Sequence, residues 1–239
     1  MTFAVCVLRQ ETIVNKGISV LLIVGVSAAA SVSSLQADPS QQPVQSHVVP
    51  LKKFPADKRS EIVSGDPTKF GAPFVIRLHR EAGYIIMPHT HSVDENIVVV
   101  QGSWALGMGE RYDPQALEPM EVGAYGLAPK GMAHFALSKT ETVIQVNGIG
   151  PFATHWVVPV YALTDKGVLL ETSPDEPGRP APASPSGCFD LKLGARVRSS
   201  HGEGVVVGAR CTPGQLTQYR IEKSEQEHFW AQRDELNTP

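Results

Sequence analysis

Short β-branched segments recur along most of this chain and constrain its fold more than any other feature. Each segment has four to six residues, and turn signals such as Gly102, Asp113-Pro114 and Lys130-Gly131 separate one segment from the next. The segments lie at 74–78, 83–87, 96–100, 103–108, 124–128, 134–137, 142–146 and 153–158. Because nothing between them has the period of a helix, the pattern predicts an all-β protein, an antiparallel sandwich or barrel.

The N-terminal segment has the layout of a secretory signal. Lys16 precedes a stretch without charge, residues 17–37, whose apolar centre runs into small residues and ends at Leu35-Gln36-Ala37. We expect residues 1–37 to be a signal peptide that is cleaved after Ala37, so that the protein is exported, periplasmic or secreted. An uncleaved membrane anchor is the alternative, but five serines dilute the span. After cleavage we expect no stable insertion in a membrane.

Charge and cysteine content narrow the function classes. With 21 basic and 24 acidic residues the net charge is −3, which gives no electrostatic footprint for nucleic acid, and we expect none as a partner. Beyond residue 37 only Cys188 and Cys211 remain. In an oxidising compartment such a pair can close a disulfide, although free thiols are also compatible with the sequence.

Composition divides the rest of the chain into four parts. A polar leader at 38–46 precedes a barrel at 47–164, and five prolines mark a linker at 165–187. The last part, 188–239, has β-type runs again, and we expect a small β-rich domain that loosely resembles SH3-like modules.

Two stretches of the barrel carry residues suited to metal binding. His89 and His91 are two apart, so on a strand both imidazoles project to one face, and Glu95 can reach the same point from the next strand. His134 can add a fourth donor from a distant strand. Imidazoles with one carboxylate suit one divalent ion such as Fe, Mn, Zn, Ni or Cu, and an octahedral ion would keep two positions open.

These stretches resemble the two cupin motifs, G-x5-H-x-H-x3-E-x6-G and G-x5-P-x-G-x2-H-x3-N. The first motif matches at five positions and the second at four, while Ser138 replaces the final Asn. The matching positions are Gly83, His89, His91, Glu95, Gly102, Gly123, Pro129, Gly131 and His134. Since each position agrees by chance about one time in 10 to 25, accidental agreement is negligible. The resemblance implies a double-stranded β-helix of jelly-roll type, with the four donors as metal ligands and possible pairing as a homodimer.

Several further residues are candidates for contact with a ligand. On an undisturbed strand Met87 and Ile85 share the face of His89 and His91, which predicts an apolar pocket wall and makes Met87 a candidate substrate contact. Gln145 and Asn147 share one face of another strand, and that face can be turned to the cavity or to water. In the first case they would bind a substrate by hydrogen bonds.

Two functions of different class follow from these residues. The first is a mononuclear metal enzyme, dioxygenase-like or a lyase or isomerase, that acts on a small organic molecule. In it Glu95 serves as the fourth ligand or takes a proton as a catalytic residue. The alternative is a module of the cell envelope that binds or senses a metal and a small ligand without catalysis. A third and weaker hypothesis makes the barrel a scaffold only.

Overall fold

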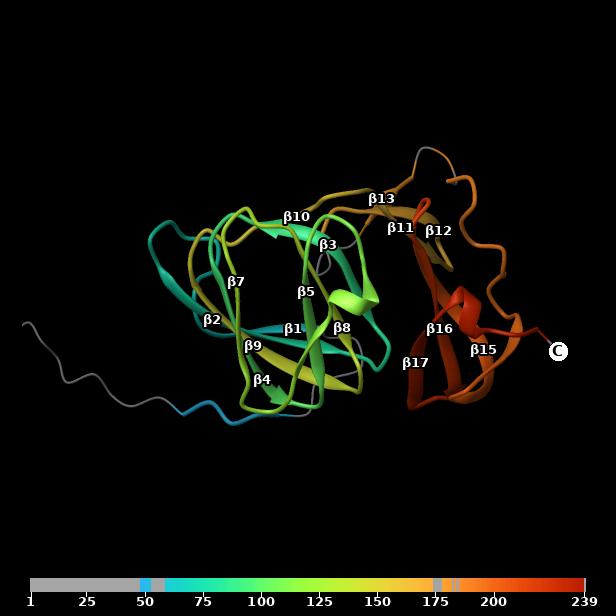
Figure 1. Cartoon of the computed structure of the whole chain (residues 1–239), viewed down its shortest axis with the longest axis horizontal. Helices are drawn as coiled ribbons and strands as arrows, with labels where there is room; N and C mark the ends of the chain where they lie inside the picture. The colour runs from blue at the N-terminus through green and yellow to red at the C-terminus, as the bar shows by residue number, and fades with distance from the viewer. Residues whose placement is uncertain (1–47, 53–58, 174–177, 182, 184, 239) are drawn as a thin grey trace, which may run out of the picture. The chain divides into compact units, whose positions relative to one another are not determined.

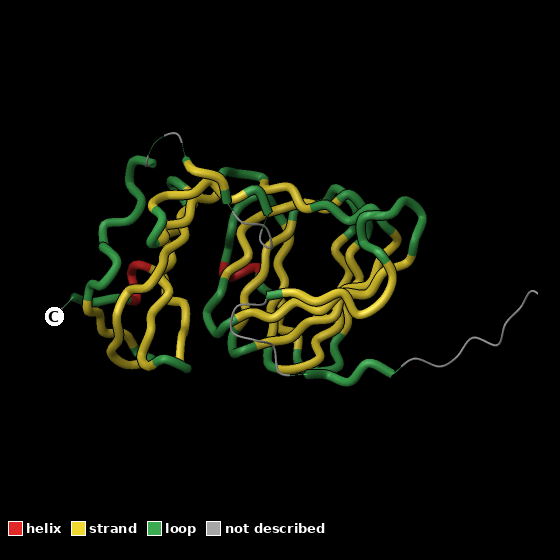
Figure 2. Tube along the Cα trace, turned by 180° about the vertical axis from the view of Figure 1, so that it is seen from behind, coloured by secondary structure: helices red, strands yellow, loops and turns green. Residues whose placement is uncertain are grey.

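The structure is a computed structural model that describes residues 48–52, 59–173, 178–181, 183 and 185–238. The predicted signal peptide and nearly all of the polar leader therefore lie outside the described residues. Strands dominate the described chain, and the two short 3-10 helices are η1 (Pro114–Ala116) and η2 (Arg233–Glu235) (Figure 2). Among the described residues, no helix is both long and apolar enough to cross a membrane.

Two five-stranded sheets form the barrel, and every pairing within them is antiparallel (Figure 1). The first sheet has the order β1 (Ser60–Gly65), β2 (Pro73–Arg80), β9 (Thr142–Ile149), β4 (Glu95–Gln101), β7 (Tyr125–Ala128). The second has the order β10 (Thr154–Trp156), β3 (Ile85–His91), β8 (His134–Ser138), β5 (Trp104–Met108), β6 (Glu118–Met120). Strands distant in sequence thus lie side by side, and the predicted all-β jelly roll is confirmed.

Alternating side chains fill the space between the two sheets. Along β2, Phe74, Ile76 and Leu78 are buried, and they join Ile144 and Val146 of β9 in one core cluster. Each large apolar side chain buried in this way stabilises the fold by about 1.5–3 kcal/mol. The same cluster contains Ile97 and Val99, which follow Glu95 on the inward face of β4, so this core packs beside the site.

A third, seven-stranded sheet uses more of the chain than the sequence predicts. Its order is β13 (Arg179–Pro180), β12 (Gly167–Glu171), β11 (Val160–Thr164), β15 (Gly202–Thr212), β16 (Leu216–Ser224), β17 (Glu227–Gln232), with β14 (Arg196–Ser199) paired to β15. The sequence predicts that 160–164 belong to the barrel and that 165–187 form a linker. Strands β11, β12 and β13 instead belong to this third sheet. The physical reason is local. Prolines concentrate after residue 173, whereas the Val-Leu-Leu run of β12 forms a hairpin with β11. The resemblance to SH3-like modules stays a prediction.

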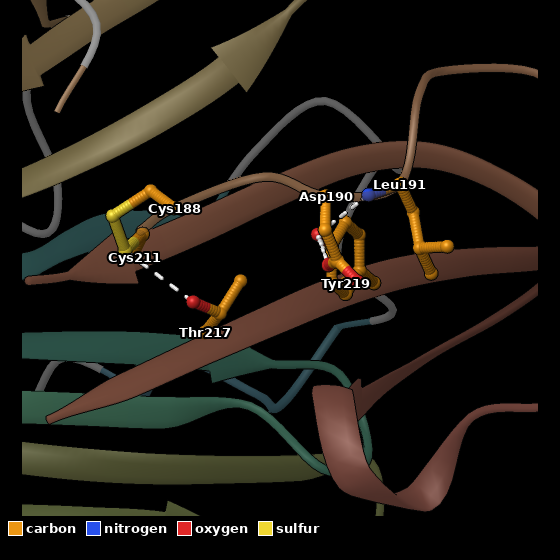
Figure 3. Close-up of a disulfide and its surroundings, with 6 residues drawn as sticks. All are labelled: Cys188, Asp190, Leu191, Cys211, Thr217 and Tyr219. Carbon is orange, nitrogen blue, oxygen red and sulfur yellow. Dashed lines mark hydrogen bonds between the residues drawn. A yellow bond between two sulfur atoms is a disulfide. The ribbon is translucent and has the colours of Figure 1, made fainter. Parts of the chain in front are cut away.

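Cys188 and Cys211 form a disulfide that ties the segment before β14 to strand β15 (Figure 3). The Cα atoms lie 5.8 Å apart, and the hydroxyl of Thr217 donates to Cys211 Sγ over 3.3 Å. Nearby, the Tyr219 hydroxyl donates to Asp190 over 2.8 Å. A bridge across 23 residues stabilises mainly by restricting the unfolded chain.

The described residues from Val49 onward form one compact unit, in which side-chain hydrogen bonds join the barrel to the seven-stranded sheet. The buried Gln218 amide accepts from the Ile85 backbone N–H over 3.1 Å and donates to the Gly83 carbonyl over 2.8 Å. Glu81 accepts hydrogen bonds from Arg220 Nε and from Trp230 Nε1, both over 2.8 Å. The C-terminal sheet is therefore fastened to the turn that leads into β3, the strand of His89 and His91.

The Glu81 carboxylate makes this junction sensitive to acid. Burial alone would raise its pKa, but the hydrogen bonds and charge of Arg220, together with Arg59 and Trp230, lower the pKa below its ordinary value of 4.5. The sign follows from linkage: the stabilisation is complete above pH 4.5 and disappears as the pH falls through the depressed pKa.

We expect Glu81→Gln to lower the free energy of unfolding at neutral pH by about 2 kcal/mol, because the charge-assisted bonds to Arg220 are lost. Below pH 4.5 the variant and wild type should converge. Urea unfolding at a series of pH values measures both effects. The matched control is Glu203→Gln, which removes an exposed ion pair with Arg198 and should cost less than about 1 kcal/mol. Parallel stability curves for Glu81→Gln and wild type would contradict the assignment.

Candidate metal centre

Four side chains that can bind a metal converge inside the barrel, and we call them the ligand cluster: His89, His91, Glu95 and His134. Their ligand atoms all lie within 4.8 Å of one another, and all four residues are buried. Strand β3 supplies two imidazoles on one face, β4 begins with the carboxylate, and β8 begins with the third imidazole. The predicted convergence of these four residues is therefore present.

The outer nitrogen of each imidazole is already engaged. His89 Nδ1 lies 2.8 Å from the Met87 carbonyl, and His134 Nδ1 lies 3.0 Å from the Met132 carbonyl. Because a carbonyl only accepts, each of these Nδ1 atoms carries the proton and donates it. The Nε2 atoms are then left with a lone pair that faces the centre of the cluster, which is the tautomer that a metal ligand requires.

The inner nitrogens lack partners. Nε2 of His91 and Nε2 of His134 are buried without a hydrogen-bond partner, and they lie 3.3 and 3.2 Å from Glu95 Oε2 in a geometry that is not a hydrogen bond. A buried polar atom left unsatisfied costs about 1–3 kcal/mol. A divalent cation at the centre would satisfy these atoms at once, so the residues present fit a metal ion.

The protonation state of His89 also favours metal binding. Burial, together with the neighbouring imidazoles of His134 and His91, holds the pKa of His89 well below its ordinary value of 6.5. At neutral pH His89 is therefore neutral, and its Nε2 can bind a cation.

A small cavity of about 20 Å³ adjoins the ligand cluster. Its walls are mostly apolar and include Ile86, Ile97, Trp104 and Phe152, while Arg80 is its only other charged lining residue among those that the structure describes. A volume of this size holds about one water molecule. The predicted apolar pocket is present, and it admits only a very small ligand beside the cluster.

Met87 lies outside this cavity, contrary to the prediction. It is fully buried and packs with Ile85 and Val160 in a separate cluster. The cause is a bulge in β3, where the register shifts between Ile86 and His89 around Pro88. The extra residue reverses the alternation, so Ile86 lines the cavity in place of Met87.

Gln145 and Asn147 also face away from the cavity. Ile144 lines it, and the alternation along β9 turns Gln145 and Asn147 to the outer face of the sheet. There Gln145 Nε2 lies 3.5 Å from Asn147 Oδ1, and Asn96 donates to the Asn147 carbonyl over 3.1 Å. The substrate role predicted for this pair therefore has no support in the geometry.

Sequence reasoning missed three residues that contact the ligand histidines. Phe152 precedes β10, and Thr154 and Trp156 lie within it. Phe152 stacks on His91 with ring centroids 4.4 Å apart, and Trp156 meets His89 edge-on at 5.7 Å. Their spacing of two was visible in the sequence, but nothing there showed which strand would pair with β3.

Comparison with models of protein families finds no match, and comparison with curated proteins finds none either. Similar solved structures include KdgF from Halomonas sp., with 20% identity over 38% of this chain and 77% of that one, at a TM-score of 0.31. An RmlC-like cupin protein from Desulfovibrio desulfuricans has 21% identity over 43% and 97%, at 0.33. Salicylate 1,2-dioxygenase from Pseudaminobacter salicylatoxidans has 15% identity over 37% of this chain and 25% of that one, at a TM-score of 0.30.

Structural neighbours of the chain thus include cupin and RmlC-like proteins. Scores this low support no argument about function, and the fold itself rests on the strand pairings given above.

Metal binding should be visible as stabilisation. We expect Zn²⁺ at 100 times its Kd to raise the free energy of unfolding by about 2.7 kcal/mol, and a chelator to reverse the gain. His134→Gln should abolish the gain, whereas His201→Gln, at an exposed turn outside the cluster, should keep it. Thermal unfolding with and without the metal measures the difference. An equal gain in wild type and His134→Gln would contradict the site.

Proposed function

We propose that the protein is a metal-binding cupin whose ligand cluster holds one divalent ion, with Fe, Mn, Zn, Ni and Cu as the candidates. We propose further that it is a mononuclear metal-dependent enzyme, dioxygenase-like or a lyase or isomerase, that acts on a small organic molecule. One observation carries the proposal: three imidazoles and one carboxylate, all buried, bring their ligand atoms within 4.8 Å of one another. Few arrangements other than a metal site bury so many polar groups together without mutual hydrogen bonds.

Each residue of the site has a distinct part in this proposal. A bound divalent ion would supply Lewis acidity and open coordination positions for a substrate. His89, His91 and His134 offer neutral Nε2 atoms, and the apolar wall that includes Ile97 and Phe152 keeps bulk water out. Glu95 is the catalytic candidate, either as the fourth ligand of the ion or as the group that takes a proton from the substrate.

Oxygen uptake tests the dioxygenase-like form. We expect the iron-loaded protein to consume O₂ in the presence of at least one diketone, flavonol or thiol, and His134→Gln to lower the rate at least about 100-fold because the metal is lost. Metal content is measured in the same samples. Full iron occupancy without uptake for any of these compounds would contradict a dioxygenase and leave the metal site standing.

The size of the cavity favours a second candidate function, a non-catalytic module that binds or senses a metal with a very small ligand. A space of about 20 Å³ accepts one water-sized molecule but no organic substrate unless side chains move. In this case the metal-loaded protein would bind small anions or water without turnover. The same oxygen-uptake experiment separates this module from the dioxygenase-like enzyme.

We also propose that the protein is exported to a periplasm or secreted. The layout of residues 1–37 and the Cys188–Cys211 disulfide support this, because disulfides persist mainly in oxidising compartments. N-terminal sequencing of the protein from the native source should begin at Asp38. A mature protein that retains residues 1–37 would contradict cleavage.

A further inference from the structure

Strand β10 and Phe152, which precedes it, present three alternate positions to the ligand histidines. In the register of the sheet, Thr154 is paired with His91 and Trp156 with His89. Phe152, two residues earlier, stacks on His91 with an angle of 24° between the rings. Because alternate residues of a strand share one face, a single short strand contacts two of the three imidazoles.

The three histidines are not held in the same way. His89 and His134 each place Nδ1 against the carbonyl two residues earlier in the chain. His91 instead has Thr154 Oγ1 at 3.2 Å and the Ala153 carbonyl at 3.4 Å, both from a segment more than 60 residues away in sequence. The orientation of His91 therefore depends on strand β10, whereas the other two rings are fixed within their own segments.

The Thr154 hydroxyl is the better of these two acceptors. The Ala153 carbonyl already accepts from the Ser92 backbone N–H over 3.1 Å, and its distance to His91 Nδ1 is at the limit for a hydrogen bond. If Nε2 of His91 is to bind a cation, the ring proton must be on Nδ1, and the hydroxyl oxygen can accept it.

Ser92 holds the acceptors in place. Its hydroxyl donates to the Pro151 carbonyl over 2.7 Å and accepts from the Ala153 backbone N–H over 2.8 Å. The residue next to His91 thus fixes the segment that leads into β10. The backbone that carries Thr154 is therefore tied to the segment of His91.

We propose that Thr154 is a positioning residue, which fixes the tautomer and the ring orientation of His91 and thereby sets the affinity of the cluster for its metal. This rests on the proposed function, because it takes His91 to be a metal ligand. Thr154 also lines the cavity beside the cluster, but it would not bind the metal itself. Its effect on the metal would pass through one hydrogen bond to His91, the ring on which Phe152 stacks.

The test compares Thr154→Val with Thr154→Ser. Valine keeps the shape and β-branching of threonine but removes the acceptor, while serine keeps the hydroxyl. We expect Thr154→Val to weaken the binding of Co²⁺ and Zn²⁺ about 10- to 100-fold, as is typical when the hydrogen-bond partner of a ligand histidine is lost. Thr154→Ser should stay within about threefold of wild type, which corresponds to less than about 0.7 kcal/mol.

Two measurements are made on the full chain. Competition with a chelator gives the metal affinity, and the visible absorption of the Co²⁺ form reports the ligand geometry, which a merely structural role of Thr154 would not change. The control is Thr164→Val, which removes a hydroxyl that donates to the Gly167 carbonyl in the β11–β12 hairpin of the seven-stranded sheet. This variant should leave the metal affinity and the Co²⁺ spectrum unchanged.

The outcomes separate this proposal from the proposed function. Failure of wild type to bind Co²⁺ or Zn²⁺ would overturn both the metal site and this role. Tight binding by wild type, with the same affinity and spectrum in Thr154→Val, would overturn the role of Thr154 alone. Equal weakening in Thr154→Val and Thr154→Ser would also overturn it, because the hydroxyl would then not be the cause.

Discussion

The burial of one carboxylate and three imidazoles at a single point is the constraint on which the rest of this structure depends. Polar groups in an apolar barrel are expensive unless each has a partner, and here the inner nitrogens of His91 and His134 have none. The outer nitrogens are held by carbonyls or by a hydroxyl, so the rings cannot turn to find other partners. A fold that positions its polar side chains in this way presents the donor set that a divalent cation requires.

Several strands position the ligand cluster. Strands β3, β4 and β8 carry the four ligand residues, and β10, at the edge of the sheet, contacts His89 and His91. The turn before β3 is in turn fastened to the C-terminal sheet through Glu81 and through Gln218. The C-terminal strands therefore help to hold the turn before β3 in place.

The sequence predicted the parts of this arrangement that depend on local pattern. Alternation and turn residues located the barrel strands, and the spacing of His89, His91, Glu95 and His134 indicated their convergence. Prediction failed where the pairing of strands decided which way a side chain points or which sheet a segment joins. A bulge at Pro88 turned Met87 away from the cavity, strand pairing decided the outward face of Gln145, and the pairing of 167–171 with β11 was hidden by the prolines that follow. The contact between Thr154 and His91 could not be predicted, because no sequence pattern shows which strand lies beside β3.

The most direct test of a metal centre is anomalous X-ray diffraction from crystals of the protein purified from its native source, recorded at the absorption edges of the candidate metals. We expect one strong anomalous peak about 2.0–2.2 Å from the Nε2 atoms of the three histidines and from an oxygen of Glu95. An ordered ligand cluster in which the inner nitrogens donate to Glu95 or to water, with no anomalous peak at any edge even after soaking with Fe, Mn, Zn, Ni and Cu salts, would contradict it.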